Sequence, residues 1–324
     1  MRLLLLAVGL AVVSARQVIR GQGSTGTFSN PVICGDFPDN DVSVGADGLF
    51  YYSASNMHFS PGAPILRSAD LVNWELIGHS VPTLDFGEKK SNKTWYWIGC
   101  VDFNNSYVYT SSPTGKWKQS ATIGKCYYDC GLLIDDDDKM YVVWGSHNIS
   151  ISQLSPDGLS EVKSQDVFTS PGTELMEGNR LYKKDGLYYV LNDYPQGLAT
   201  YIWKSTTPWA PWTYKLLQAF TPAPVEDGIT PHQGSLIKTS HGDWYFLSFT
   251  WAYPNGRMPV LAPITWGSDG YPILTLVNGS WGTTYPNPLP TVKTPSWTGS
   301  DTFRGDKLDV SWKWNHNPDK TNTV

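Results

Sequence analysis

The sequence is poor in charge, in cysteine and in long apolar runs. Charged residues make up 16% of the 324 residues, and the formal net charge is −5. A protein that binds a polyanion needs an excess of lysine and arginine, so this balance excludes a nucleic-acid partner. After residue 13 no apolar stretch is long enough to span a bilayer, and we expect no membrane partner.

Helical patterning is lacking as well, and aromatic and turn-forming residues stand in its place. The chain has 15 Trp, 18 Tyr and 11 Phe, together with 30 Gly and 23 Pro. Proline or glycine interrupts most windows that are long enough for a helix. So many aromatic residues and so little charge exclude a disordered chain and a coiled coil. The composition therefore favours an all-β protein with many tight turns.

The N-terminus has the pattern of a secretory signal. Met1-Arg2 is followed by an apolar run over residues 3–13 and by the small residues Ser14-Ala15. A short apolar run between a basic start and a small-residue cleavage site is typical of a signal peptide, and this run is too short to cross a bilayer. Residues 1–15 are therefore predicted to be a signal peptide, with a buried first strand or helix as the alternative. We expect a secreted, extracellular protein.

Sequons and cysteines agree with an oxidising compartment. Four Asn-x-Ser/Thr sequons are candidate glycosylation sites: Asn92, Asn104, Asn148 and Asn278. The number of cysteines is even, which suits disulfide formation, and three pairings are possible: the residues are Cys34, Cys100, Cys126 and Cys130. No histidine lies near Cys126 and Cys130 in the sequence, so we predict no metal site there.

A polar turn followed by a strand containing aromatic residues recurs five times. The copies begin at Asp47, Asn92, Asp137, Asp185 and His241. With residues 48, 93, 138, 186 and 242 as markers, the intervals are 45, 45, 48 and 56 residues. This spacing fits a unit of four short strands, the blade of a β-propeller. We therefore predict an all-β fold, a five-bladed β-propeller, over residues 16–285.

Titratable residues lie upstream of four of these turns. Asp39, Asp129 and Glu177 each lie 9 residues before the marker of their turn, and His232 lies 10 before. The first strand of a propeller blade lines the central channel, so we expect these side chains to surround one axis. Carboxyls brought together have their pKa values pushed apart, which is what the hydrolysis of a glycosidic bond requires. The alternative is that they are ordinary turn and strand-edge residues.

The same residues carry a resemblance to glycoside hydrolase family 43. Five segments are similar to motifs of that family: residues 30–39 (NPVICGDFPD), Tyr128-Asp129, Glu177-Gly178, His232-Gln233-Gly234-Ser235 and Gly256-Arg257. The resemblance covers roughly residues 28–286. It implies that Asp39 is the general base and Glu177 the general acid, and that Asp129 tunes and orients this acid. It also implies that Arg257 contacts the substrate and that His232 lies near the channel centre.

The resemblance also implies a five-bladed propeller and an activity. Members of this kind are inverting, exo-acting hydrolases of plant cell-wall pentosans, and the sequence looks most like fungal α-L-arabinofuranosidases that act on arabinoxylan. A β-xylosidase acting on xylo-oligosaccharides has the same motifs, and an inactive propeller that only binds carbohydrate is a third reading. No cofactor is expected to be required, although a structural calcium near His232 is one expectation. The protein is expected to be a monomer.

Several assignments have alternatives within the sequence. Asp36 and Asp41 compete with Asp39 for the role of base, and Asn40-Asp41 stands where the family usually has Pro-Ser. Arg257 could form a structural salt bridge instead of binding substrate. For His232, a core or water-binding role is an alternative to catalysis.

The pattern breaks in two places. Residues 85–92 (DFGEKKSN) occupy the place of the first strand of the second blade, yet they are charged and lack alternation. We therefore predict that this blade lacks its inner strand and that its folding is weakened. Residues 286–300 have the composition of a linker, and residues 301–324 are predicted to begin a C-terminal β-sandwich domain that is truncated here.

Overall fold

The computed structural model describes residues 26–56, 59–81, 95–100, 103–111, 116–172, 175–209, 211–304 and 308–315. The predicted signal peptide, the sequon at Asn92 and residues 85–92 lie outside these ranges. All statements below concern the described residues.

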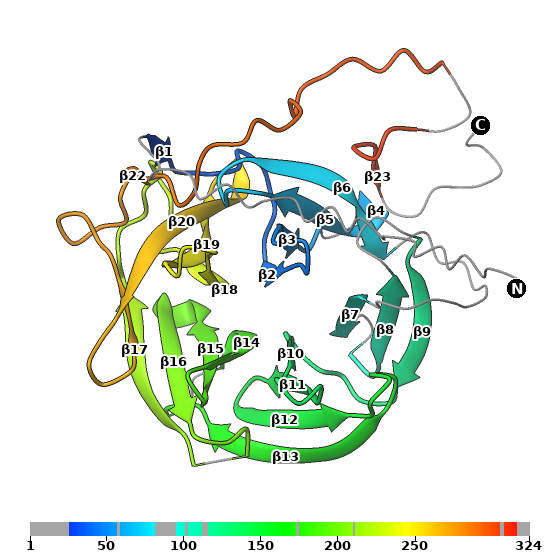
Figure 1. Cartoon of the computed structure of the whole chain (residues 1–324), viewed down its shortest axis with the longest axis vertical. Helices are drawn as coiled ribbons and strands as arrows, with labels where there is room; N and C mark the ends of the chain where they lie inside the picture. The colour runs from blue at the N-terminus through cyan, green and yellow to red at the C-terminus, as the bar shows by residue number, and fades with distance from the viewer. Residues whose placement is uncertain are drawn as a thin grey trace, which may run out of the picture.

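Five antiparallel sheets surround a central axis, as Figure 1 shows. Blade one contains β2 (Asp41–Val44), β3 (Phe50–Ser53), β5 (Gly62–Ser68) and β6 (Trp74–Val81). Blade two contains β7 (Trp95–Cys100), β8 (Ser106–Ser111) and β9 (Lys118–Ile123). Blade three contains β10 (Gly131–Ile134), β11 (Met140–Gly145), β12 (Asn148–Leu154) and β13 (Glu161–Thr169).

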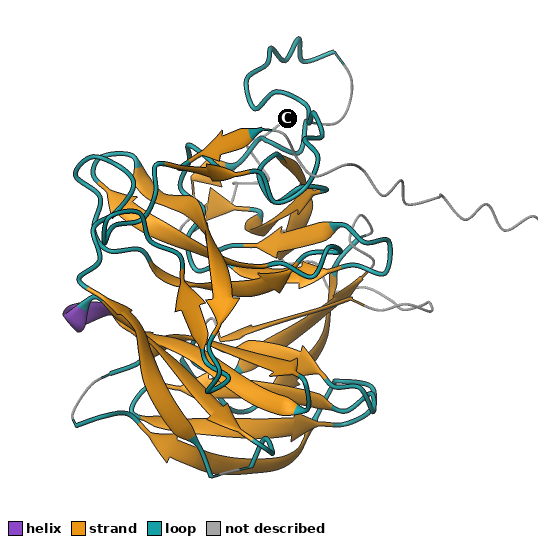
Figure 2. Ribbon diagram, turned by 60° about the vertical axis from the view of Figure 1, so that its left-hand side comes forward, coloured by secondary structure: helices purple, strands orange, loops and turns teal. Residues whose placement is uncertain are grey.

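Blade four contains β14 (Glu177–Lys184), β15 (Leu187–Tyr194), β16 (Ala199–Ser205) and β17 (Thr213–Ala219). Blade five contains β18 (His232–Lys238), β19 (Trp244–Ala252), β20 (Gly256–Trp266) and β21 (Pro272–Leu274). The prediction of an all-β, five-bladed propeller is confirmed. Figure 2 shows the same sheets from the side, with η1 (Pro195–Gly197) as the single helix that is drawn.

In blades one, three, four and five, the repeated turns join the first and second strands. In blade four, Lys184 pairs with Leu187, so Asp185 and Gly186 alone make the turn, with φ of 51° and 78°. Positive φ at both central residues is the hairpin turn whose twist suits the flanking strands, and Asp-Gly is a preferred sequence for it. The repeat could be recognised in the sequence because these turns need residues that accept positive φ.

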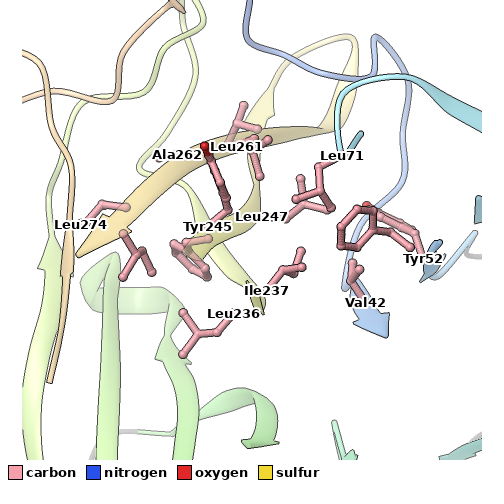
Figure 3. Close-up of a cluster of buried hydrophobic side chains, with 14 of the residues drawn as sticks. Val42, Tyr52, Leu71, Leu236, Ile237, Tyr245, Leu247, Leu261, Ala262 and Leu274 are labelled. Carbon is pink, nitrogen blue, oxygen red and sulfur yellow. The ribbon is translucent and has the colours of Figure 1, made fainter. Parts of the chain in front are cut away.

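The main core lies between neighbouring blades. Figure 3 shows Val42 and Tyr52 of blade one near Leu236, Ile237 and Leu247 of blade five, and all five side chains are buried. Alternate side chains of a strand point to opposite faces of its sheet, so each blade can present an apolar row to each neighbour. Each such side chain contributes about 1.5–3 kcal/mol by burial. This packing fixes β2 against β18.

The N-terminal segment closes the ring. β1 (Thr27–Ser29) pairs with β22 (Thr284–Pro286). The Asn30 side chain donates to the carbonyls of Leu261 and Gly282 and accepts from the Leu261 N–H, at 2.8–3.0 Å. The Phe37 N–H then donates to the Arg257 carbonyl at 3.1 Å. The segment before Asp39 therefore runs along β20.

Blade two has three described strands where each other blade has four. The predicted absence of its inner strand concerns residues 85–92, which lie outside the described ranges, and stays a prediction. These three strands nevertheless pair in continuous order, from β7 through β8 to β9. A disulfide joins Cys100 at the end of β7 to Cys126, beyond the end of β9. Cys34 and Cys130 are free thiols.

The segment after the propeller returns to blade one. β23 (Trp314–Asn315) pairs with β4 (Phe59–Ser60) in a small two-stranded sheet. The predicted β-sandwich over residues 301–324 stays a prediction, because the structure describes only part of this range. Within the described parts of the chain, we find no helix with the length and apolar character needed to cross a membrane.

Candidate active site

The starts of four first strands meet at one cavity. β2, β10, β14 and β18 each lie at the inner end of their blade, toward the central axis in Figure 1. The cavity has a volume of about 970 Å³, and its lining includes Asp39, Asp129, Gly178 and Gln233. Glu177 immediately precedes Gly178 and is influenced electrostatically by both Asp129 and Asp39. The structure thus brings the three predicted carboxylates together.

An unusual backbone conformation presents these side chains. Asp39 and Asp129 have φ of 58° and 44°, in the left-handed region, two residues before their strands begin. Aspartate tolerates this conformation better than most residues because its short polar side chain can bond locally. In blade four the left-handed position is Gly178 (φ 63°), directly after Glu177. Each carboxyl therefore leaves the chain where it turns into the channel strand.

Asp39 is half-buried and paired with a cation. Arg257 Nη1 lies 3.0 Å from Asp39 Oδ1. Burial raises the pKa of Asp39 above its ordinary value, while the Arg257 charge opposes this rise. The pair keeps a carboxylate available in a cavity that would otherwise favour its protonated form.

A buried arginine fixes the backbone around Asp39. Arg180 Nη2 donates to the carbonyls of Asp39 and Asn40 at 3.0 and 2.7 Å, and its Nη1 donates to the Cys130 carbonyl at 3.3 Å. Arg180 belongs to β14, three residues after Glu177. One guanidinium therefore connects the strand of Glu177 with the turns that carry Asp39 and Asp129.

Glu177 is held in a different environment from Asp39. The Tyr128 hydroxyl donates to Glu177 Oε1 at 3.1 Å. Burial raises the pKa of Glu177, the neighbouring Asp129 charge raises it further, and the Tyr128 hydrogen bond lowers it. The Asp129 Oδ2 accepts from the Gly178 N–H and from Gln233 Nε2, both at 3.1 Å. Burial and the Asp129 charge outweigh the Tyr128 hydrogen bond and favour a proton on Glu177, which can then act as an acid.

The two competing aspartates have other contacts. Asp36 Oδ1 accepts from the Arg257 N–H at 2.8 Å, and it is not among the described residues that line the cavity. Asp41 lines the cavity and lies 3.7 Å from Arg180 Nε. Burial raises the pKa of Asp41, and Arg180 opposes this. Asp39, which pairs with Arg257 from blade five, fits the role of base best.

His232 lies beside the site and packs into the wall. Its ring lies 4.9 Å from the Phe249 ring, between centroids, and its Nδ1 lies 3.0 Å from the Thr230 carbonyl oxygen. Burial lowers the pKa of His232, which favours the neutral ring. The Arg257 guanidinium lies over the same Phe249 ring, with its Cζ 5.5 Å from the ring centroid. The predicted substrate contacts of His232 and Arg257 stay predictions.

The residues around His232 do not gather as calcium ligands would. Calcium takes six to eight oxygen ligands, usually including carboxylates. Among the described residues, no three His, Cys, Asp or Glu side chains come together at a point where they could hold a metal ion. A structural calcium near His232 stays a prediction.

Aromatic side chains form the wall of the cavity toward blade two. The lining there includes Tyr96, Trp97, Tyr107, Tyr109 and Trp117. Trp97 and Tyr109 meet edge to face, with 5.8 Å between ring centroids. Aromatic walls with a few convergent polar groups are typical of small-molecule sites.

The sequence reasoning assigned no role to four residues of the site. Tyr128 bonds to Glu177, Gln233 bonds to Asp129, and Arg180 bonds to the Asp39 carbonyl. Asp193 accepts from the Gln233 N–H. For Gln233 a signal existed, since it lies 9 residues before Gly242, the spacing of Asp39 and Asp129 from their markers. For Arg180 and Asp193 no periodic signal exists, because their partners are distant in the sequence.

The predicted glycosylation sites lie on the surface where they are described. Asn104, Asn148 and Asn278 are exposed. Their modification stays a prediction.

Comparison with known proteins identifies relatives over nearly the whole chain. The model of the glycosyl hydrolases family 43 matches residues 28–272. A β-xylosidase of Formosa agariphila is 25% identical, over 93% of this chain and 60% of its own length. The non-reducing end α-L-arabinofuranosidase BoGH43B of Bacteroides ovatus is 27% identical, over 98% of this chain and 65% of its own length. The chain thus spans less than two thirds of these relatives.

Solved structures agree with this comparison. A GH43 glycoside hydrolase, engineered in its active site to display both endo-xylanase and exo-arabinofuranosidase activity, is 38% identical with a TM-score of 0.84. The match covers 91% of this chain and 64% of that one. A bifunctional GH43-CE protein of Bacteroides eggerthii is 26% identical with a TM-score of 0.76, over 93% of this chain and 42% of that one.

Proposed function

The chain belongs to glycosyl hydrolases family 43, and from this premise we propose that it is an inverting exo-glycosidase that releases L-arabinofuranose from arabinoxylan. The observation that carries the proposal is the meeting of Asp39 and Asp129 at one cavity, with Glu177 next to the cavity-lining Gly178 and within electrostatic reach of both aspartates. Two carboxyls in different environments can serve as base and acid at the same pH.

Asp39 acts as the general base. It takes a proton from a water molecule on one face of the pentose, and the oxygen of that water forms the new bond to the anomeric carbon. Arg257 keeps Asp39 ionised against the effect of burial. Attack from the face opposite the leaving group gives a product of inverted configuration.

Glu177 acts as the general acid. It gives its proton to the glycosidic oxygen as the bond from that oxygen to the anomeric carbon breaks. Burial and the Asp129 charge keep this proton on Glu177 before the reaction. After the step Glu177 is ionised and Asp39 protonated, so one proton returns through solvent to restore the starting state.

A β-xylosidase acting on xylo-oligosaccharides is the second candidate. The relatives from Formosa agariphila and Xylanibacter ruminicola are a β-xylosidase and a putative β-xylosidase, which supports it. We further propose that the protein is a secreted, glycosylated monomer whose partner is plant cell-wall polysaccharide. The predicted signal peptide and the exposed Asn104, Asn148 and Asn278 support secretion and glycosylation.

A proton NMR time course with soluble arabinoxylan tests the proposal. The first anomeric signal should be that of β-arabinose, and the Glu177→Gln and Asp39→Asn variants should not produce it. Xylose released from xylo-oligosaccharides, with no arabinose, would transfer the assignment to the second candidate. A titration that shows oligosaccharide binding without release of either sugar would instead indicate a carbohydrate-binding propeller.

A further inference from the structure

Gln233 occupies in blade five the place that Asp39 and Asp129 occupy in blades one and three. Each of the three lies 9 residues before the marker of its turn. Their φ angles are 49°, 58° and 44°, all in the left-handed region. This conformation is uncommon for a long side chain such as glutamine, so local preference does not explain it. The conformation of Gln233 instead serves to direct its side-chain amide toward a particular partner.

The Gln233 amide bonds to the catalytic carboxylate of blade three. Nε2 donates to Asp129 Oδ2 at 3.1 Å, beside the Gly178 N–H. Because a carboxylate only accepts hydrogen bonds, this contact fixes which end of the amide faces it. A Cβ on residue 178 would lie 2.4 Å from Gln233 Cγ, so only glycine there leaves room for this side chain.

The backbone of Gln233 bonds to the strand next to Glu177. Its N–H donates to Asp193 Oδ2 at 2.6 Å, and Asp193 is the cross-strand partner of Glu177 between β14 and β15. The connections therefore form a ring: Glu177 to Asp193 through the sheet, Asp193 to Gln233, Gln233 to Asp129, and Asp129 back to Gly178. This ring ties blades three, four and five together at the acid.

The other end of the amide does not contribute to stability. Gln233 is only 4% exposed, and its Oε1 is buried without a hydrogen-bond partner among the described residues. A buried unpaired acceptor costs stability, and an apolar side chain of similar shape would remove this cost. A glutamine retained under that cost points to a role in activity.

We propose that Gln233 is a positioning residue that holds the Asp129 carboxylate where its charge keeps the acid protonated. This inference rests on the proposed function of the site. Asp129, Tyr128, Asp193, Asp39, Arg180 and Arg257 are the titratable or charged groups around the acid. Of these, Asp129 is the one whose carboxylate the Gln233 side chain holds, so a change at residue 233 acts on the acid through Asp129.

The test is the Gln233→Met variant of the full chain. It keeps the shape of the side chain and removes the donor, so kcat should fall about tenfold to a hundredfold, as for loss of a hydrogen bond to a charged group. Once Asp129 moves away, the pKa of Glu177 falls, and the alkaline limb of kcat/KM moves to lower pH. The free energy of unfolding should change little, because removal of the unpaired acceptor offsets loss of the hydrogen bond to Asp129. Lower stability with an unmoved pH profile would indicate a purely structural role and overturn the proposal.

Two further variants sharpen the test. Thr239→Val removes another buried hydroxyl that has no partner among the described residues, in the turn of blade five. It should leave kcat and the pH profile unchanged while stability stays the same or rises. Gln233→Glu should recover activity toward acid pH, where its protonated carboxyl can donate to Asp129, while Gln233→Met should not recover. Equal losses in both variants at acid pH would contradict the proposal.

A measurement without turnover separates this inference from the proposed function. The carboxyl ¹³C signal of Glu177, assigned with the Glu177→Gln variant, can be titrated in the free protein. The titration should move to lower pH in Gln233→Met, and an unmoved titration would overturn the proposal. If the unmodified protein releases neither arabinose nor xylose, the proposed function fails, and this titration still decides the role of Gln233.

Discussion

Replacing Arg257 by methionine should weaken the base more than it weakens the fold. Arg257 Nη1 and Asp39 Oδ1 are 3.0 Å apart. Asp39 must be ionised to accept a proton from water, and burial already raises its pKa. Without the guanidinium this pKa rises further, so Asp39 becomes protonated at pH values where it is ionised in the unmodified protein. The acid limb of kcat/KM should therefore move to higher pH.

The size of the effect follows from the geometry. Two unit charges at this distance attract by about 5 kcal/mol at an effective dielectric constant of about 20. The two side chains retain 21% and 26% of their exposure, so water screens part of this attraction. We take about 2–3 kcal/mol as the remainder, in the lower part of the range for truncated charge pairs. Since about 1.4 kcal/mol is a factor of ten, the variant should lose about 30-fold to 150-fold more kcat/KM at acid pH than at neutral pH.

The assay is kcat/KM for an aryl pentoside as a function of pH, for both proteins. Arg67→Met is the matched control, because Arg67 forms an ion pair with Glu75 at 2.7 Å, of similar exposure and away from the catalytic carboxylates. It should leave the profile unchanged. If the Arg257 variant loses the same factor at every pH, Arg257 acts through substrate binding alone, and the reasoning about Asp39 is refuted.

Three further predictions concern other parts of the site and fold. Tyr128→Phe removes the hydrogen bond that lowers the pKa of Glu177, so the alkaline limb of kcat/KM should move to higher pH; a shift to lower pH would contradict this. Burial raises the pKa of Asp193 to about 7, so it should cost stability as pH rises from about 4 to 7. The free energy of unfolding, measured with urea, should therefore fall over that pH range in the unmodified protein. In Asp193→Asn this fall should be smaller by up to about 4 kcal/mol, and an unchanged fall would refute the assignment. The double variant Cys100→Ser, Cys126→Ser removes a disulfide whose cysteines are 26 residues apart in the sequence. Thermal unfolding should show a loss of about 3 kcal/mol in stability. Cys34→Ser, which changes a free thiol, should not lower stability.

The fold could be predicted because its turns depend on the conformational preferences of the few residues that form them. A hairpin such as Asp185-Gly186 needs residues that accept positive φ, and this requirement appears in the sequence at each repeat. The disulfide partner of Cys100 could not be predicted, because three pairings were open. The pairing of β23 with β4 joins segments some 250 residues apart, and nothing in either segment specifies the other.

The site, like the fold, contains residues that the sequence predicts and residues that it does not. Asp39 and Asp129 were found because they share one spacing and one backbone conformation. Arg180 gives no local signal, since its partners are carbonyl groups 140 residues away that become neighbours only when the ring closes. The motif in blade five directed attention to His232, although the spacing of the repeat identifies Gln233, the side chain that reaches Asp129.

The described part of blade two bears on binding more than on the chemical step. The carboxylates come from blades one, three and four, and Arg257 and Gln233 come from blade five, so no catalytic candidate belongs to blade two. Blade two instead supplies the aromatic wall around Trp97. A change that widens this wall alters how a sugar is held, while base and acid keep their partners. We therefore expect changes in blade two to appear in KM and in the choice of pentose, and we expect kcat to depend on the ring of contacts around Glu177.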